Sequence, residues 1–269
     1  MTQDNVSADT PYFSSDVLDV SVYDHVAHVT LNRPDSANSL DDRLMRDLKS
    51  LWRAIASDRG IRCIVLTGAG RHFCAGADVS LLASDRTDVG RDAADELSFL
   101  PGDVVDVPVI VAVNGTCAGG GLHFVSDADI VIAAEGSRFI DSHVSVGQVS
   151  GIEPVELMTL MRRDRAVRMA LLGRHEVLDA ATALDSGLVS EVLPPDGLLP
   201  RAHDLAAQVC SGSPAAIRHT RRVIRAYLAD SVRTHRDLGW ELVQRHWAHP
   251  DSKEGPAAFQ EKREPHWVD

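Results

Sequence analysis

The chain has 269 residues, a length that suits one large domain with a sizeable buried core. Hydrophobic residues make up 44% of the sequence and charged residues 25%, which is the balance of an ordinary globular protein. The formal net charge of −12 argues against binding a phosphate backbone, so we predict no nucleic-acid partner. No two of the four cysteines have C-x-x-C spacing, so neither a zinc ribbon nor a redox pair is indicated.

The first residues are polar and acidic, with no basic and apolar regions of a signal peptide. The sequence also contains no apolar run of membrane-spanning length. We therefore expect no membrane association, a cytoplasmic location, and a short disordered leader over residues 1–16.

The first half of the chain predicts strands and helices in alternation. Residues 17–32 are typical of two strands around a turn near Asp24, and 39–58 predict an amphipathic helix capped by Ser39. Buried strands are predicted at 61–68 and 107–115, each followed by a small-residue turn and a helical stretch. Strand, turn and helix therefore occur twice in this order, which indicates an α/β fold.

From about residue 153 the pattern becomes mainly helical, beginning with "EPVELMTLMRRDRAVRMALLG". A helix, a glycine stop and a strand are predicted in "LDAATALDSGLVSEVLPP". Prolines near 194–200 mark a boundary between a core at 17–197 and a helical region at 198–269. We expect two long amphipathic helices over residues 213–251, and we expect the C-terminal region to form an appendage that packs on a neighbouring subunit.

Two small-residue turns, "FCAGAD" and "AGGGL", lie where a strand gives way to a helix. Small residues let another molecule approach the main chain, and the first N–H groups of a helix lack internal partners. Two such turns on adjacent parallel strands would direct two N–H groups at one point, as in an oxyanion hole. Neither turn matches G-x-G-x-x-G or the P-loop, so a nucleotide-binding fold fits less well.

Four motifs, "RHFCAGADV", "PVIVAVNGTCAGGG", "SDADIVIAAEGSRF" and "KEGPAAFQEKREPHW", resemble those of the enoyl-CoA hydratase/isomerase (crotonase) superfamily. The match is colinear over roughly residues 17–265. The resemblance implies a spiral of ββα units and a C-terminal region that assembles a homotrimer or a dimer of trimers. It also implies an acyl-CoA substrate, in which coenzyme A is part of the substrate and no further cofactor is needed.

The resemblance assigns roles to individual residues. It implies that the amides of Ala75 and Gly120 hold the thioester oxygen. Phe259 and Lys262 would reach coenzyme A bound by this chain or by a neighbouring subunit. Together the implied substrate and coenzyme A residues are Arg33, Ala37, Gly76, Ala77, Asp78, Phe259 and Lys262.

The sequence departs from the hydratases of the superfamily at two positions where they carry glutamates. These positions are His123, two residues after the glycine triplet, and His143 in "FIDSH". An imidazole has a pKa near neutrality and can act as acid or base, and an apolar pocket would favour its neutral form. Hydration needs a group that deprotonates water and a group that protonates the α-carbon, and two histidines can share this work.

Further candidates lie near these histidines. Gly120 and His123 are three apart, so on a helix they share a face. Asp141 lies two residues before His143 in a segment expected to be extended, and it would orient the ring as the carboxylate of a hydrolytic triad does. Glu153 is a third acidic candidate, because some members of the superfamily carry an acidic catalytic residue in this turn.

The histidine pair leaves the reaction open. The superfamily resemblance favours hydration or isomerisation of an enoyl-CoA by a His/His acid–base pair. Hydrolysis of a C–C bond in a β-diketone and hydrolysis of a thioester are alternatives, and so is a catalytically silent crotonase-like scaffold. Two histidines and a carboxylate are also a possible zinc ligand set, but we predict no metal because the family needs none.

Overall fold

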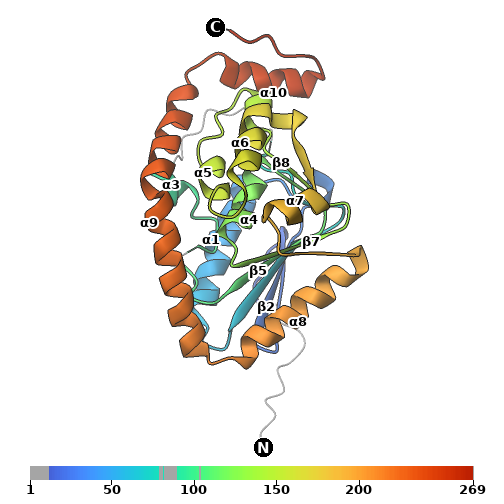
Figure 1. The fold of residues 1–269 in the computed structure, drawn as a ribbon, viewed down its shortest axis with the longest axis vertical. Coiled ribbons are helices and arrows are strands. Elements are labelled where there is room, and N and C mark those ends of the chain that lie inside the picture. The colour runs from blue at the N-terminus through green and yellow to red at the C-terminus, as the bar shows by residue number, and fades with distance from the viewer. Residues whose placement is uncertain (1–11, 79–80, 82–89, 103, 269) are drawn as a thin grey trace, which may run out of the picture.

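A computed structural model describes residues 12–78, 81, 90–102 and 104–268 (Figure 1). Its larger sheet has six strands in the order β1-β2-β3-β5-β7-β10. Only β1 and β2 pair antiparallel within it, and the other neighbours are parallel. The strands are β1 (Leu18–Tyr23), β2 (Val26–Leu31), β3 (Cys63–Gly68), β5 (Val109–Val113), β7 (Ile130–Ala134) and β10 (Glu191–Leu193).

A smaller sheet of four strands has the order β4-β6-β8-β9. Its strands are β4 (His72–Cys74), β6 (Thr116–Ala118), β8 (Arg138–Ile140) and β9 (Val177–Asp179). Each of β3, β5 and β7 leads into the next strand of this second sheet, and helical segments follow β6 and β8. The predicted α/β spiral of ββα units is confirmed by this repeated passage between the two sheets.

Helix α1 (Asp42–Ser57) has the apolar face that its sequence predicted. This face belongs to the larger of two hydrophobic cores, the main core, and consists of Leu44, Leu48, Leu51, Trp52 and Ile55. Its N-cap is Asp41, not Ser39 as expected, because the Asp41 side chain accepts a hydrogen bond from the Leu44 amide at 2.7 Å. The Ser39 hydroxyl instead donates to Asp78 at 2.9 Å.

The helical half differs from expectation in two places. The stretch from Glu153 forms two helices, α5 (Glu153–Leu157) and α6 (Arg163–Leu172), rather than one. The region after 213 forms one helix of 33 residues, α9 (Pro214–His246), rather than two, since it contains no proline beyond its first turn. The predicted glycine stop is confirmed at Gly187, which ends α7 (Ala180–Ser186) at φ 90°.

The C-terminal region is not an appendage. Helix α8 (Leu198–Ser211) covers the face of the larger sheet opposite the main core and forms a second core with it, around Ala202 and Ala206. Helix α9 runs along one side of the molecule and α10 (Asp251–Glu261) lies across its end (Figure 1). The remaining helices are α3 (Ala93–Glu96), α4 (Leu122–Asp127), η1 (Pro34–Ser36), η2 (Gly119–Gly121), η3 (His143–Val146), η4 (Gly173–His175) and η5 (Pro195–Gly197).

Part of the predicted leader is ordered. Tyr12 and Phe13 pack against the main core, and the Ser15 hydroxyl donates to Asp47 at 2.6 Å. Burial of two aromatic rings gives this segment a fixed place, whereas residues 1–11 of the predicted leader lie outside the described residues. None of the helices within the described ranges is long and apolar enough to span a membrane.

Candidate active site

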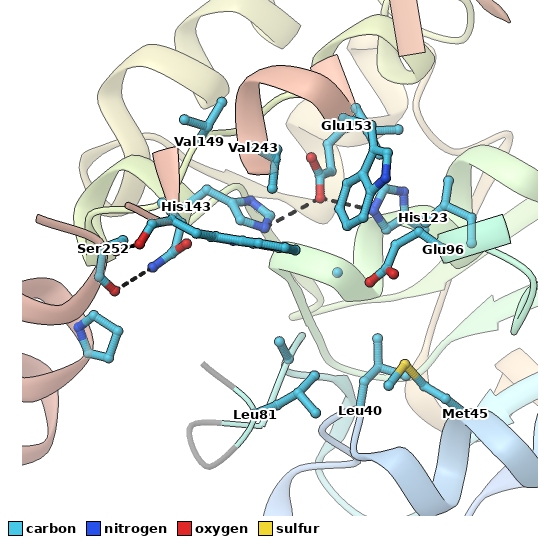
Figure 2. A pocket seen from close by; sticks show the side chains of 18 of the residues that line it. Leu40, Met45, Leu81, Glu96, His123, His143, Val149, Glu153, Val243 and Ser252 are labelled. Atoms are coloured by element: carbon cyan, nitrogen blue, oxygen red, sulfur yellow. Dashed lines mark hydrogen bonds and ion pairs between the residues drawn. The ribbon is translucent and has the colours of Figure 1, made fainter. Parts of the chain in front are cut away.

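The two small-residue turns, α4, α5, α9 and α10 surround a cavity of about 570 Å³. Figure 2 shows His123, His143 and Glu153 on one side of it and Leu40, Leu81 and Met45 on the other. Its lining residues are Leu40, Met45, Ala77, Leu81, Glu96, Leu97, Phe99, Gly120, His123, His143, Gln148, Val149, Ile152, Glu153, Trp240, Val243, Trp247, Ser252, Lys253, Pro256, Ala257 and Gln260. Most of these residues are apolar, and the polar ones come from several elements: Glu96, His123, His143, Gln148, Glu153, Ser252, Lys253 and Gln260.

The two predicted turns do come together. Strands β4 and β6 are parallel neighbours with Cys74 opposite Cys117, so the turns that follow them lie side by side. A Cβ placed on Gly120 would lie 3.7 Å from the nitrogen of Ala77. The amides of Gly120 and Ala77 are therefore close together, and both residues line the cavity.

Ala75, the residue expected to supply the first amide, is placed differently. It is exposed, does not line the cavity, and donates its N–H to the Ala37 carbonyl at 3.0 Å. Ala77 forms a parallel bridge with Leu40, in which Leu40 donates to Gly76 and Asp78 donates to Leu40. In this pattern the N–H of Ala77 points away from Leu40. The amide that lies beside Gly120 at the cavity is therefore that of Ala77, and the expected Ala75 amide is bonded elsewhere.

His123 lies on α4, three residues after Gly120 as predicted, and only 6% of it is exposed. Its Nε2 lies 3.0 Å from Glu153 Oε1, and its Nδ1 lies 3.1 Å from Glu156 Oε2. Both ring nitrogens therefore face carboxylates.

His143 begins η3, so the segment containing it turns rather than staying extended as expected. The predicted contact with Asp141 is nevertheless present, since His143 Nδ1 lies 2.8 Å from Asp141 Oδ1. Asp141 is fully buried, and its other oxygen accepts a hydrogen bond from Ser150 Oγ at 2.5 Å. This arrangement fixes the ring and leaves its Nε2 facing Glu153 at 3.4 Å.

Glu153 is the group that joins the two histidines. It stands at the start of α5, is 5% exposed, and faces both Nε2 atoms with the same oxygen, Oε1 (Figure 2). The result is one continuous cluster, Asp141–His143–Glu153–His123–Glu156, rather than two separate histidines.

The charges of this cluster favour protonated rings. Burial by itself lowers the pKa of His123, but Glu153 and Glu156 outweigh it and raise the pKa to about 10. Burial likewise opposes charge on His143, yet Glu153 and Asp141 raise its pKa to about 9. Burial disfavours the charged form of Glu153, but the two imidazoliums hold the pKa of Glu153 well below its usual range. The pKa of each ring is thus raised, not lowered as an apolar pocket would lower it, because buried carboxylates contact both rings.

Two residues at this cluster, Glu156 and Arg236, were not predicted from the sequence. Glu156 lies three residues after Glu153 on α5, and this spacing alone was a usable signal. Arg236 lies on α9, with its Nε 3.3 Å from Glu156 Oε1. Nothing in the sequence links Arg236 to α5, so only the packing of the two helices reveals this contact.

The predicted coenzyme A residues lie in two places, one beside the small-residue turns and the other at the C-terminal end of the chain. Beside the turns, the Arg33 guanidinium lies 3.0 Å from Asp41 and 3.4 Å from Asp78, next to the cavity residue Ala77. Gly76 packs against the Gly119–Gly120 turn, and the Ala37 carbonyl accepts a hydrogen bond from the Ala75 amide.

At the other end of the chain, Phe259 is 63% exposed and Lys262 is exposed, and neither lines the cavity. Their neighbours Pro256 and Ala257 on α10 do line it. Contact of any of these residues with coenzyme A stays a prediction.

The cluster is bonded within itself rather than arranged around an ion. Among the described residues, no group of three or more His, Cys, Asp or Glu side chains has the geometry to hold a metal. Cys74 and Cys117 are buried beside the turns, and burial raises the pKa of both thiols.

The chain is similar to known proteins over nearly its whole length. The model of the enoyl-CoA hydratase/isomerase family matches residues 21–269. The chain is 32% identical to (E)-benzylidenesuccinyl-CoA hydratase of Thauera aromatica over 253 residues, which are 91% of this chain and 96% of the relative. It is 34% identical to a mevalonyl-coenzyme A hydratase of Beauveria bassiana over 261 residues, 91% of this chain and 92% of the relative.

A crystal structure of an enoyl-CoA hydratase/isomerase from Pseudoalteromonas atlantica T6c superposes with a TM-score of 0.84 at 30% identity, covering 94% of this chain and 100% of that chain. The fold, the family model and the relatives agree over nearly the whole length. The chain belongs to the enoyl-CoA hydratase/isomerase, or crotonase, superfamily.

Proposed function

We propose that the protein is an acyl-CoA enzyme that adds water across the double bond of an α,β-unsaturated thioester, or removes it. The observation that carries this proposal is one cavity lined both by Gly120 and Ala77, whose amides are close together, and by His123, His143 and Glu153 of the buried cluster. Both kinds of group are needed, because hydration passes through an enolate and moves two protons.

The amides of Gly120 and Ala77 would bind the thioester oxygen. As water adds to the β-carbon, negative charge develops on this oxygen, and two preorganised N–H donors stabilise it. Gly119 adopts φ 48°, which glycine accepts readily and which lets η2 begin directly after β6. The turn thus presents the Gly120 amide without a side chain in the way of the substrate.

Glu153 and His123 would move the protons. The Glu153 carboxylate takes one proton from the water whose oxygen bonds to the β-carbon, and the His123 imidazolium gives one proton to the α-carbon. Glu153 is then protonated and His123 neutral, and transfer of that proton across their 3.0 Å contact restores the starting state. His143 and Asp141 hold the Glu153 carboxylate in place throughout. This assignment differs from a simple His/His pair, since Glu153 takes part as the base.

The experiment is to follow the loss of enoyl absorbance with crotonyl-CoA and with bulkier enoyl-CoA thioesters. We expect turnover of at least one thioester, and a fall in kcat of about 10²–10⁴-fold in Glu153→Gln and in His123→Ala with the fold intact. Glu176→Gln, which alters a carboxylate paired with Arg168 outside the cavity, is the matched control. Unchanged activity in Glu153→Gln would refute the assigned role.

A second candidate, hydrolysis of a C–C bond in a β-diketone, is favoured by one observation. The buried Asp141 holds His143 through Nδ1 at 2.8 Å, as the carboxylate of a hydrolytic triad holds its base. A cyclic β-diketone in the same absorbance assay tests this reaction. Turnover of the diketone without turnover of any enoyl-CoA would replace hydration by hydrolysis, and inactivity on both would favour a silent scaffold.

A further inference from the structure

We propose that Glu156, held by Ser126 and Arg236, is the positioning residue of His123. Neither Glu156 nor Arg236 lines the cavity, so neither would touch the substrate. They would act through the His123 ring, by fixing its orientation and by keeping it protonated. The catalytic consequence rests on the proposed function, whereas the effect on the ring does not.

The contacts of Glu156 show how it would hold the ring. Its Oε2 lies 3.1 Å from His123 Nδ1 and accepts a hydrogen bond from Ser126 Oγ at 2.6 Å. Its Oε1 lies 3.3 Å from Arg236 Nε, an ion-pair distance at which this N–H forms no hydrogen bond to a described residue. One carboxylate oxygen is thus held by a histidine and a serine, and the other faces a guanidinium.

His143 is held in the same way. Its Nδ1 faces Asp141, whose second oxygen accepts a serine hydroxyl from Ser150. In both cases a carboxylate with a serine donor takes Nδ1, and Nε2 is left for Glu153. A histidine, a carboxylate and a serine therefore occur together on each side of Glu153, although Ser126 bonds to the oxygen that faces His123 and Ser150 to the oxygen that does not face His143.

The positive charge of Arg236 balances a negative charge in the cluster. Asp141, Glu153 and Glu156 are three buried acids, and two imidazoliums balance only two of them. An unbalanced buried carboxylate is costly, and the Arg236 guanidinium balances the third. The nearby half-buried carboxylate of Asp127 has its own partner, Arg225, at 2.7 Å.

Close packing of α9 places Arg236 within reach. Gly239 on α9 lies against Gly151, and a Cβ on Gly239 would overlap the Gly151 carbonyl oxygen. Arg236 is one turn before Gly239, and Gly151 lies two residues before Glu153. The glycine contact thus brings α9 against the start of α5, where Glu153 and Glu156 stand.

Several titratable and charged groups lie around His123, and Glu153 and Glu156 are the ones that raise its pKa. They are Glu153 and Glu156 from α5, His143 from η3, Arg236 from α9 behind Glu156, Asp127 with Arg225 beside Glu156, and Glu96 from α3 on the cavity wall. Glu156 is the one that meets Nδ1. Replacing it by Gln keeps an acceptor oxygen there and removes only the charge.

The experiment is a titration of 15N-histidine-labelled protein by NMR, which needs no substrate. We expect the His123 transition to move down by about one pH unit or more in Glu156→Gln, since one pKa unit corresponds to losing one modest ion pair. Arg236→Gln should not lower it, because the lost group is a cation, but should raise the pH at which Glu156 takes up its proton. Arg236→Lys should restore the wild-type curve.

Glu176→Gln and Arg168→Gln serve as controls, because they remove the same groups from a Glu–Arg pair outside the cluster. A His123 transition in Glu156→Gln that matches the wild type or Glu176→Gln would overturn the proposal. With a thioester that the wild type turns over, Glu156→Gln should lower kcat and leave KM nearly unchanged. A raised KM with unchanged kcat would also overturn the proposal. Absence of any activity would refute the proposed function alone, since the titration still decides the role of Glu156.

Discussion

Glu153 changes how the two histidines are understood. The superfamily resemblance placed His123 and His143 at the positions of the hydratase glutamates and suggested that they work as a pair. In the structure they meet at one carboxylate oxygen, at 3.0 Å and 3.4 Å. In the proposed mechanism, the acid–base unit is therefore a carboxylate between two histidines rather than a pair of histidines alone.

Asp141 offers a test of this unit at a position that does not contact the cavity. Asp141→Asn keeps the size of the side chain but removes the charge opposite His143 Nδ1. We expect kcat to fall by about 10²–10³-fold with little change in KM, because the His143 ring loses its orientation and its charge. Steady-state kinetics with circular dichroism as a folding control measures this, and a change confined to KM would contradict it.

The raised pKa values of the histidines predict how stability depends on pH. Their folded-state values of about 10 and 9 exceed the ordinary value of 6.5, so their contribution is complete below pH about 6.5 and is lost as the pH rises through 9–10. The lowered pKa of Glu153 acts in the other direction, since its contribution is present above its ordinary value of 4.5 and is lost as the pH falls toward its folded-state pKa.

The measurement is the free energy of unfolding of the wild type and of His143→Gln at several pH values. The advantage of the wild type should shrink steadily between pH about 6.5 and 9. A difference that grows over this range would mean that the ring is neutral in the folded protein.

At the scale of elements, the contact between α9 and the turn before α5 sets the geometry of the site. Gly239 is buried in the middle of a long helix, where glycine ordinarily costs about 1 kcal/mol relative to alanine. Because Gly239 has no Cβ, the Gly151 backbone can approach it closely. Packing of α9 therefore explains a glycine at this position, although glycine is a weak helix former.

We therefore predict that Gly239→Ala lowers the free energy of unfolding by about 1–3 kcal/mol, although a free helix would gain stability. The clash with the Gly151 backbone outweighs the helical propensity of alanine. Chemical denaturation measures the change, with Gly197→Ala as the control, since a Cβ there meets nothing closer than 3.8 Å. A stabilised Gly239→Ala protein would contradict the packing described.

Elements with their own periodic pattern were predictable, and contacts between distant elements were not. Strands β3 and β5, α7 with its Gly187 stop, and the two small-residue turns all follow from local residue types. The choice of Ala77 over Ala75 depends on the bridge with Leu40, a residue more than thirty positions away. The Arg236–Glu156 pair depends on the docking of α9 and leaves no local signal in the sequence.

At the scale of the whole molecule, several large apolar side chains of α9 and α6 are exposed. Val223 and Tyr227 on α9 are 71% and 73% exposed, and Leu171 on α6 is 73% exposed. The homotrimer or dimer of trimers implied by the superfamily resemblance stays a prediction that fits these surfaces.

Light scattering coupled to size-exclusion chromatography tests the assembly. We expect a mass of three or six times the 29.1 kDa of one chain. If α9 contributes to the interface, Tyr227→Glu should shift the mass toward one chain, because a charge would be buried among apolar groups. A wild-type mass of one chain at micromolar concentration would contradict the expected assembly.

Exchange of the α-protons of a saturated acyl-CoA with deuterium, followed by 1H NMR in D2O, tests most directly whether the amides and His123 act together on a thioester. In the proposed mechanism, exchange needs an enolate held by the Gly120 and Ala77 amides and removal of the α-proton by the neutral form of His123, but no water addition. We predict exchange by the wild type that slows by about 10²-fold or more in His123→Ala. Absence of exchange in the wild type, or equal exchange in both proteins, would contradict the proposed enolate chemistry.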